Sequence, residues 1–174
     1  MKKGISRHVV GSTDDRSVAG EIVGDLNGMG HRFGVVVSRF NRDLTQQLLD
    51  DAVQTFREAG VSDHGVHVVW VPGAYEIPSV LEKLAEGGGF SALLAFGVVI
   101  QGETPHADLI GREVAHHSIA IARTYSLPIL DGVVLAGSYE LAEARSTRGS
   151  ESRGTYVARA ALEMANVFRQ LEEM

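Results

Sequence analysis

The feature that most constrains the fold is a regular alternation of short β-branched runs with longer amphipathic segments. Residues 33–38 read Phe-Gly-Val-Val-Val-Ser, a length and composition typical of a buried strand. Comparable runs predict further strands at 66–71, 91–100 and 128–135. Apolar residues at helical spacing predict helices over about 44–60, 76–86, 108–125, 138–148 and 155–172.

This alternation indicates the fold class. Strands that alternate with helices form a parallel sheet whose two faces are both covered. Right-handed crossovers then give a three-layer α/β sandwich, with helices on each side of four parallel strands. In such folds ligands bind beyond the carboxyl ends of the strands. The loops that follow the strands are therefore where functional residues are expected.

Length and composition narrow the range of functions. The 174 residues suit one domain, which we assign to residues 20–174, and the polar, aperiodic residues 1–19 are expected to be a flexible extension. Acidic residues outnumber basic ones by 22 to 16, which argues against a nucleic-acid-binding protein. The absence of cysteine excludes disulfides, thiolate metal sites and a Cys nucleophile. No apolar run has the length of a signal core or a membrane span, so we expect a cytoplasmic chain.

Two loops after predicted strands carry residues with two interpretations each. Phe40 offers an aromatic face on which a flat heterocycle can stack, or it packs beneath its own helix. Glu76 can accept hydrogen bonds from sugar hydroxyls, or it caps the helix that it begins. The sequence leaves both alternatives open.

The loop after the third strand is the most informative. It opens at Gly102 and leads into a helix expected to begin near Asp108, so its backbone N–H groups can face an anion, with the Thr104 hydroxyl as a further donor. His106 lies beside this candidate anion site and can exchange protons near neutral pH, whereas the other six histidines lack such a context. Arg145, late in the fourth helix, either clamps a phosphate or is a solvated surface residue.

Taken together, these segments resemble the lumazine synthase family. The matching stretches, in the family's order and spacing, are residues 24–26, 28–30, 38–41, 70–78, 99–108 and 158–165. The resemblance covers about residues 21–172. It implies a flavodoxin-like fold in which the segment near residues 21–26 adds a strand to the sheet of a neighbouring subunit.

The resemblance also implies a reaction. The family condenses 5-amino-6-(D-ribitylamino)uracil with 3,4-dihydroxy-2-butanone 4-phosphate to 6,7-dimethyl-8-ribityllumazine, the penultimate step of riboflavin biosynthesis, without metal or organic cofactor. An imine forms, phosphate leaves and the ring closes, with His106 as the implied proton donor and acceptor. The implied aminouracil-binding residues are Phe40, Ala74, Tyr75, Glu76, Val98, Val99, Ile100 and Asp131. The implied phosphate-binding residues are Gly102, Glu103, Thr104 and Arg145.

Three positions depart from the family's commonest pattern. Asp131 stands where many members carry an aromatic residue that reaches the neighbour's pyrimidine pocket, and its carboxylate could hydrogen-bond to the ring or the ribityl hydroxyls instead. Gln101 replaces a frequent basic residue, and Gly149 stands where a lysine is common. We expect these changes to affect affinity more than chemistry, with Asp131→Asn altering aminouracil binding more than turnover.

The resemblance implies at least a pentamer with sites shared between neighbours, and it leaves open a 60-mer shell of twelve pentamers and an association with riboflavin synthase. One alternative is a non-catalytic shell or flavin-binding member, against which the retention of Phe40, Glu76, His106 and Arg145 speaks. A second is a phosphoacceptor domain, which needs clustered acids after the first strand to hold a metal ion. The chain has Ser-Arg-Phe-Asn there.

Overall fold

The computed structural model describes residues 20–103, 105–147 and 152–174, so the expected extension at 1–19 lies outside the described residues. Four strands form one sheet in the order β2-β1-β3-β4, and all neighbours are parallel. The strands are β1 (Phe33–Ser38), β2 (Val66–Val71), β3 (Ala92–Ile100) and β4 (Ile129–Ala136). The strand predictions are confirmed to within one residue at each end.

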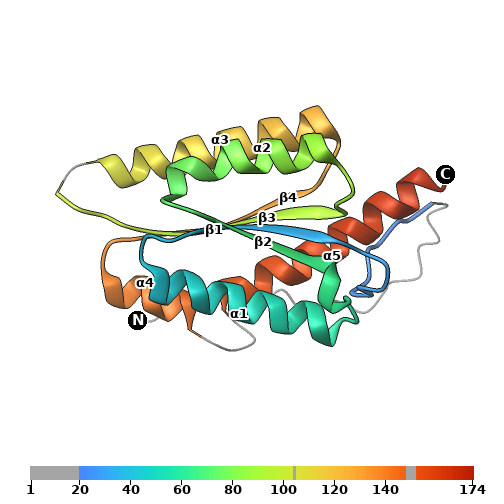
Figure 1. Cartoon of the computed structure of the whole chain (residues 1–174), viewed down its shortest axis with the longest axis horizontal. Coiled ribbons are helices and arrows are strands. Elements are labelled where there is room, and N and C mark those ends of the chain that lie inside the picture. Colours follow the sequence, from blue (N-terminus) through green and yellow to red (C-terminus); the bar gives the residue numbers. More distant parts are fainter. Residues whose placement is uncertain (1–19, 104, 148–151) are drawn as a thin grey trace, which may run out of the picture.

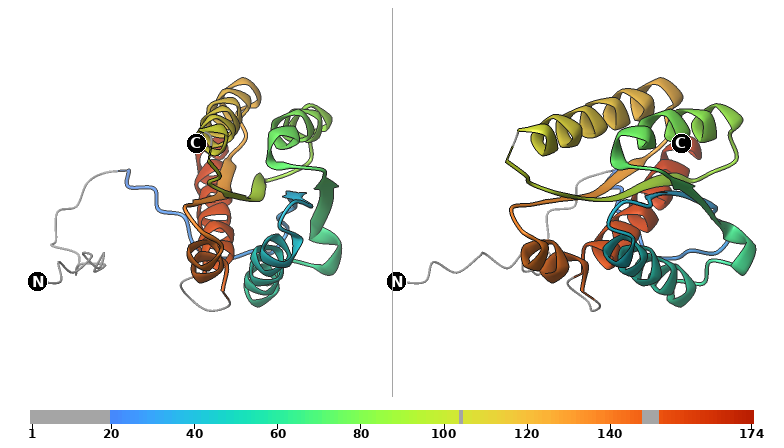
Figure 2. Two further views of the ribbon diagram at one scale, coloured as in Figure 1. Left: turned by 90° about the vertical axis from the view of Figure 1, so that its left-hand side faces the viewer. Right: turned by 60° about the vertical axis from the view of Figure 1, so that its left-hand side comes forward.

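Helices cover both faces of this sheet, which confirms the three-layer prediction. One face carries α2 and α3 and the other carries α1, α4 and α5, as the separated layers of Figures 1 and 2 show. The helices are α1 (Arg42–Glu58), α2 (Ile77–Gly87), α3 (His106–Tyr125), α4 (Tyr139–Ser146) and α5 (Arg153–Glu172). Single 3₁₀ turns precede β2 at Asp63–Gly65 and α2 at Ala74–Glu76.

The two-residue period of the strands divides the core between the two faces. Along β1, Val35 and Val37 pack in the cluster beneath α1 and α5, whereas Val36 packs in the cluster beneath α2 and α3. All six side chains of β1 are buried. A strand covered on both faces needs apolar residues at consecutive positions, which is why residues 33–38 show no polar alternation.

The order of the strands determines where a ligand can enter. The chain leaves β1 for β2 on one side and later returns to pair β3 with the other side of β1. The connections therefore diverge between the carboxyl ends of β1 and β3, and a crevice forms at such a switch point. This is the end of the sheet from which α1 and α3 begin, on the left of Figure 1.

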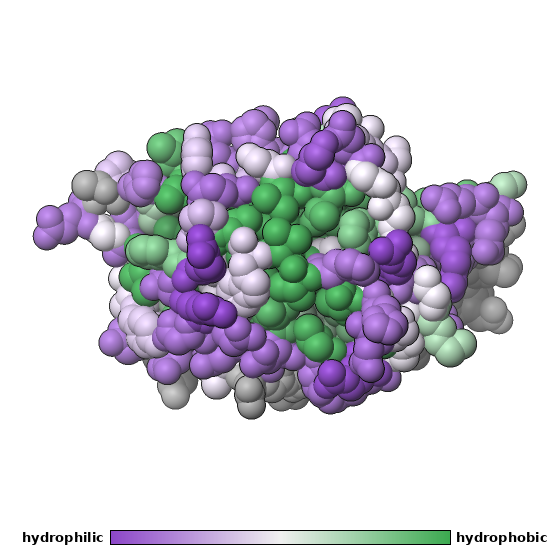
Figure 3. Space-filling view, in the orientation of Figure 1, coloured by the Kyte–Doolittle hydropathy of each residue, from purple (hydrophilic) through white to green (hydrophobic). Residues whose placement is uncertain are grey.

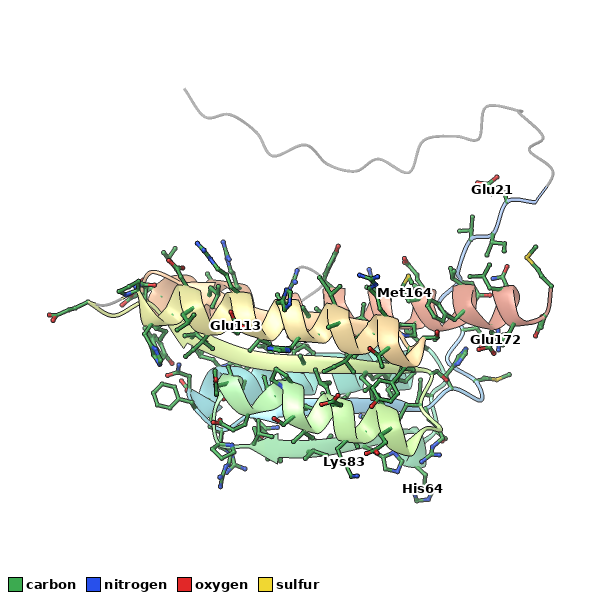
Figure 4. All side chains as sticks on the ribbon, turned by 90° about the horizontal axis from the view of Figure 1, so that it is seen from above. Glu21, His64, Lys83, Glu113, Met164 and Glu172 are labelled. Carbon is green, nitrogen blue, oxygen red and sulfur yellow. The ribbon has the colours of Figure 1, made fainter. Side chains whose placement is uncertain are left out.

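The N-terminal segment is attached to α5 by the side chain of Asn166. Its amide nitrogen donates to the carbonyl oxygens of Asp25 and Asn27, each at 3.0 Å, and its oxygen accepts from Nε2 of the buried His31 at 3.1 Å. Gly24 passes so close to α5 that a Cβ would lie 2.1 Å from a carbonyl oxygen of that helix. The segment is thus held at a defined point, beyond which Glu21 projects away from the layers (Figure 4).

Helices α1 and α5 touch through a glycine, and this contact gives a stability prediction. A Cβ at Gly154 would lie 2.3 Å from the carbonyl oxygen of Leu48, a backbone atom that can move only if α1 moves. We expect Gly154→Ala to lower the free energy of unfolding by about 1–3 kcal/mol through overpacking. The measurement is urea denaturation at one fixed protein concentration.

Gly137→Ala is the matched control, because a Cβ at Gly137 meets no atom within 4 Å. A midpoint for Gly154→Ala equal to that of the control would contradict the close packing of α1 on α5.

Candidate active site

Phe40 is the second residue after β1, and its ring is exposed to solvent. Its backbone N–H donates to the Ser38 hydroxyl at 3.1 Å, and 68% of the residue is exposed. The ring therefore does not pack beneath α1, which rejects one of the two interpretations open from sequence. An exposed aromatic ring just beyond the carboxyl end of β1 is suited to stacking on a planar ring.

Asn41 ties this loop to the neighbouring strand. Its side-chain amide donates to the Val98 carbonyl of β3 at 2.9 Å, so the loop after β1 is joined to the end of β3. The backbone of Asn41 is left-handed, with φ of 54°, a conformation that Asn tolerates better than other side chains except glycine. This geometry turns the chain from β1 into α1 and leaves Phe40 on the outside of the turn.

The loop after β2 forms the 3₁₀ turn Ala74–Glu76, in which Ala74 is buried and Tyr75 is 65% exposed. Glu76 Oε2 accepts from the Gly73 backbone N–H at 2.8 Å, which closes the 3₁₀ turn, whereas the Glu76 side chain makes no capping hydrogen bond to α2. The carboxylate remains exposed, and its other oxygen can still accept from a ligand. The turn packs directly on β3, because a Cβ at Gly97 would lie 3.2 Å from the Ala74 Cβ.

The end of β3 lies between these two loops. Val98 is 1% exposed and contributes its carbonyl to Asn41, whereas Val99 and Ile100 are half-buried. The backbone N–H of Gln101 donates to the Ala136 carbonyl at 2.8 Å, which extends the pairing with β4 by one residue. Gln101 is therefore held at the rim of the sheet.

The loop from Gly102 to the start of α3 differs from expectation in one respect. Helix α3 begins at His106, two residues before the predicted Asp108, because Pro105 at the N-cap position sets a backbone angle compatible with a helix start. His106 thus occupies the first turn of a helix, where free N–H groups and the helix dipole favour an anion. Gly102, Glu103 and His106 are exposed, and Thr104 lies outside the described residues.

Arg145 lies at a different place, in the last turn of α4, and it is exposed. It lines a hollow with residues of β4 and α5, namely Val133, Val134, Leu135, Ala144, Arg153 and Tyr156. Arg153 is a candidate that sequence reasoning missed. Its Nη2 donates to the Asp131 carbonyl at 2.6 Å, and its guanidinium lies 5.4 Å from the centre of the Tyr156 ring.

Two polar contacts fix α4 and with it Arg145. The Ser138 hydroxyl accepts from the Leu141 backbone N–H at 3.3 Å, which caps the helix. The Tyr139 hydroxyl donates to the Asp43 carboxylate at the start of α1. This hydrogen bond raises the pKa of Tyr139, and a hydrogen bond with Ser138 lowers the pKa of Glu140.

The predicted site residues therefore form two groups. The residues after β1, β2 and β3 surround the switch point, whereas Asp131 and Arg145 belong to the region of β4, α4 and α5. No hydrogen bond in the described part of the chain joins the second group to Phe40, Glu76 or His106. Within residues 20–103, 105–147 and 152–174, no three His, Asp or Glu side chains are placed to hold a metal ion, and no helix could span a bilayer.

Comparison with known proteins identifies the group to which this arrangement belongs. Residues 30–169 match the profile of the 6,7-dimethyl-8-ribityllumazine synthase family. The chain belongs to this family. A 6,7-dimethyl-8-ribityllumazine synthase from Azoarcus sp. (strain BH72) is 40% identical over 152 residues, which cover 87% of this chain and 95% of that relative. The lumazine synthase match spans the switch point as well as the hollow beside Arg145.

The hydrogen bond from Asn41 to Val98 predicts how substitution of Asn41 changes the stability of this lumazine synthase family member. Asn41→Ala removes the bond to Val98. It also puts alanine in a left-handed conformation, with φ of 54°, that alanine tolerates less well than asparagine. We therefore expect the free energy of unfolding to fall by about 2 kcal/mol. Asn41→Gly removes only the bond, and we expect it to lose about half as much. Parallel urea titrations of the two variants measure the difference. Unchanged stability in both would show that the bond does not hold the loop.

Proposed function

We propose that the site at the carboxyl ends of β1, β2 and β3 carries out the family's reaction in this chain. The family joins 5-amino-6-(D-ribitylamino)uracil to 3,4-dihydroxy-2-butanone 4-phosphate, which yields 6,7-dimethyl-8-ribityllumazine for riboflavin biosynthesis. The observation that carries the proposal is the placement of an exposed aromatic ring, an exposed carboxylate and a helix-start histidine around one switch point. A ligand-free shell would have no use for this combination.

The aminouracil is assigned to the first of the two groups. Phe40 stacks on the pyrimidine ring, and the free oxygen of Glu76 accepts from ribityl hydroxyls beside Ala74 and Tyr75. The half-buried Val99 and Ile100 line the pocket, and Val98 forms its floor. An aromatic platform with a few positioned acceptors is the usual composition of a small-molecule site.

The phosphate is assigned to the start of α3. The N–H groups of its first turn, with Gly102, Glu103 and Thr104 before it, face the anion, and Arg145 of a neighbouring subunit adds a guanidinium. His106 lies at the same helix start and moves the protons of imine formation and phosphate loss. Both substrates are reactive, so holding them together supplies much of the rate.

His106 is tested with a matched histidine on the same helix. We expect His106→Ala to lower kcat about tenfold to a hundredfold, because a positioned general acid–base group is lost. His116→Ala is the control, since His116 is also an exposed residue of α3. Lumazine absorbance is followed against the uncatalysed background. Wild-type protein without acceleration would instead support a non-catalytic shell or flavin-binding member.

The separation of the two groups supports a site shared between subunits. Arg145 lines a hollow with residues of β4 and α5 that includes neither Phe40 nor His106, so we propose that the complete set takes Arg145 from a second copy. We propose the pentamer typical of the family as this assembly. A 60-mer shell and an enclosed riboflavin synthase are further extensions of the same proposal.

The outer edge of β2 is the proposed place of strand addition. The Arg39 N–H donates to the Val71 carbonyl, so Val69 and Val71 face β1 while Val66, Val68 and Trp70 direct their backbone groups outward. Val68 is 38% exposed, and Figure 3 shows an apolar area over this edge, between α1 and α2. A free edge with apolar surroundings is suited to pairing with an extended segment, for which we propose residues 21–26 of a neighbour.

Substitution of Val68 tests this mode of assembly. Val68→Pro removes the outward N–H but no bond to β1, so we expect the subunit to keep its fold and lose the native oligomer mass. Val68→Thr is the control, because it keeps both the N–H and β-branching. Light scattering gives the mass and circular dichroism the fold. A Val68→Pro protein of unchanged mass would exclude strand addition at β2.

A further inference from the structure

Helix α4 has little apolar surface with which to hold its place. Of its eight residues only Ala142 and Ser146 are buried, and the other six are exposed. In proteins most of the stability of a short helix comes from packing of an apolar face, and this face is narrow. The direction of α4 therefore depends strongly on the polar contacts at its ends.

Two of these contacts stabilise the helix itself. At its start the Ser138 hydroxyl accepts from the Leu141 backbone N–H at 3.3 Å, and at its end the Thr147 hydroxyl donates to the Glu143 carbonyl at 2.5 Å. Both bonds lie within the helix and its caps, so they keep α4 folded without attaching it to another element. We therefore treat α4 as a short rigid unit.

The side chain of Tyr139 attaches this unit to α1. Its hydroxyl donates to the carboxylate of Asp43, a residue 96 positions earlier in the first turn of α1. The start of a helix favours a negative charge, so Asp43 is a suitable acceptor there. The hydrogen bond to Asp43 raises the pKa of Tyr139, so the hydroxyl keeps its proton and remains a donor near neutral pH.

The start of α1 is a fixed base for this attachment. The buried Thr45 donates its hydroxyl to the Ser38 carbonyl at 2.8 Å, and the backbone N–H of Thr45 donates to the Asn41 carbonyl at 3.1 Å. Asp43 lies inside this segment, three residues after Phe40. Tyr139 thus ties α4 to the part of the chain that carries the exposed aromatic ring.

Arg145 lies at the other end of α4, in its last turn, where it is exposed and lines the hollow beside β4 and α5. Six residues separate it from Tyr139, which corresponds to about 9 Å of helix. A tilt of α4 by about 10° would move its far end by about 1.5 Å, more than a hydrogen bond tolerates. The place of the guanidinium therefore depends on the attachment at Tyr139.

We propose that Tyr139 is a positioning residue for Arg145, because its hydrogen bond to Asp43 sets where the guanidinium meets the phosphate of the butanone substrate. This inference rests on the proposed function, in which Arg145 serves the site of a neighbouring subunit. Tyr139 itself touches no substrate. Since Asp43 and Phe40 belong to one segment, the same bond fixes the aromatic ring of one site relative to the guanidinium that serves the next.

The first experiment uses Tyr139→Phe in the assembled enzyme, which removes only the hydroxyl. We expect the KM for the butanone phosphate to rise about threefold to fivefold, with smaller changes in kcat and in the KM for the aminouracil. Tyr125→Phe is the matched control, because Tyr125 ends α3 just before β4, at the opposite end of the sheet. An unchanged KM for the butanone phosphate, or a rise confined to the aminouracil, would overturn the proposal.

The second experiment tests the acceptor and the residue through which Tyr139 acts. Asp43→Asn keeps a side-chain oxygen for the Tyr139 hydroxyl, so we expect KM values near those of the wild type, whereas Asp43→Ala should match Tyr139→Phe. Adding Tyr139→Phe to Arg145→Ala should cause no further rise in KM, because Tyr139 acts through Arg145. Additive effects in that double variant, or a KM for Asp43→Ala equal to that of the wild type, would contradict the positioning role.

Two measurements are independent of turnover. In calorimetric titrations with inorganic phosphate, Tyr139→Phe should bind about threefold to fivefold more weakly than the wild type or Asp43→Asn. In hydrogen exchange, the peptide that covers residues 139–146 should exchange faster in Tyr139→Phe and Asp43→Ala than in Asp43→Asn. Equal phosphate affinity or equal exchange in all proteins would overturn the inference. If the wild type forms no lumazine, the proposed function fails, and the phosphate titration still decides whether Tyr139 positions Arg145.

Discussion

The hydrogen bond between the Asn41 side chain and the Val98 carbonyl joins the ends of β1 and β3, the two strands between which the chain connections diverge. The pairing of β1 with β3 ends at Val37 and Phe96, so this bond ties the loop after β1 to the part of β3 beyond that pairing. The bond fixes the loop that carries the exposed Phe40 against the end of β3, the strand that leads towards α3. A family whose chemistry depends on bringing two substrates together requires such fixed spacing.

The two edges of the sheet behave differently for a simple geometric reason. In a parallel sheet every second residue of an edge strand directs its peptide groups outward, and these groups need partners. On β4 the partners are Asp131 and Arg153 of the same chain, whereas on β2 the outward groups lie among exposed apolar side chains. The edge of β4 is therefore occupied by its own chain at residues 131–133, which favours the edge of β2 for strand addition.

Much of the fold follows from local sequence, because buried parallel strands are apolar at consecutive positions and end at glycine, proline or polar residues. Residues 33–38 and 66–71 show this directly, and both strands have the predicted bounds. The start of α3 was predicted two residues late, since a helix that begins after proline lacks a side-chain cap to mark it. The hydrogen bonds of His31 and Arg153 could not be predicted from the residues next to them in the sequence. Their partners, Asn166 and the Asp131 carbonyl, lie 135 and 22 residues away, and backbone acceptors leave no trace in composition.

The attachment of the N-terminal segment to α5 has a consequence for biosynthesis. The carbonyl of Asp25 finds its donor in Asn166, 141 positions later in the chain, and the Val23 carbonyl finds its donor in Gln170. On the ribosome, these early residues have no docking surface until the helix at 153–172 has been translated and has left the exit tunnel. The segment proposed to pair with a neighbouring subunit is therefore oriented only after the rest of the chain has been synthesised.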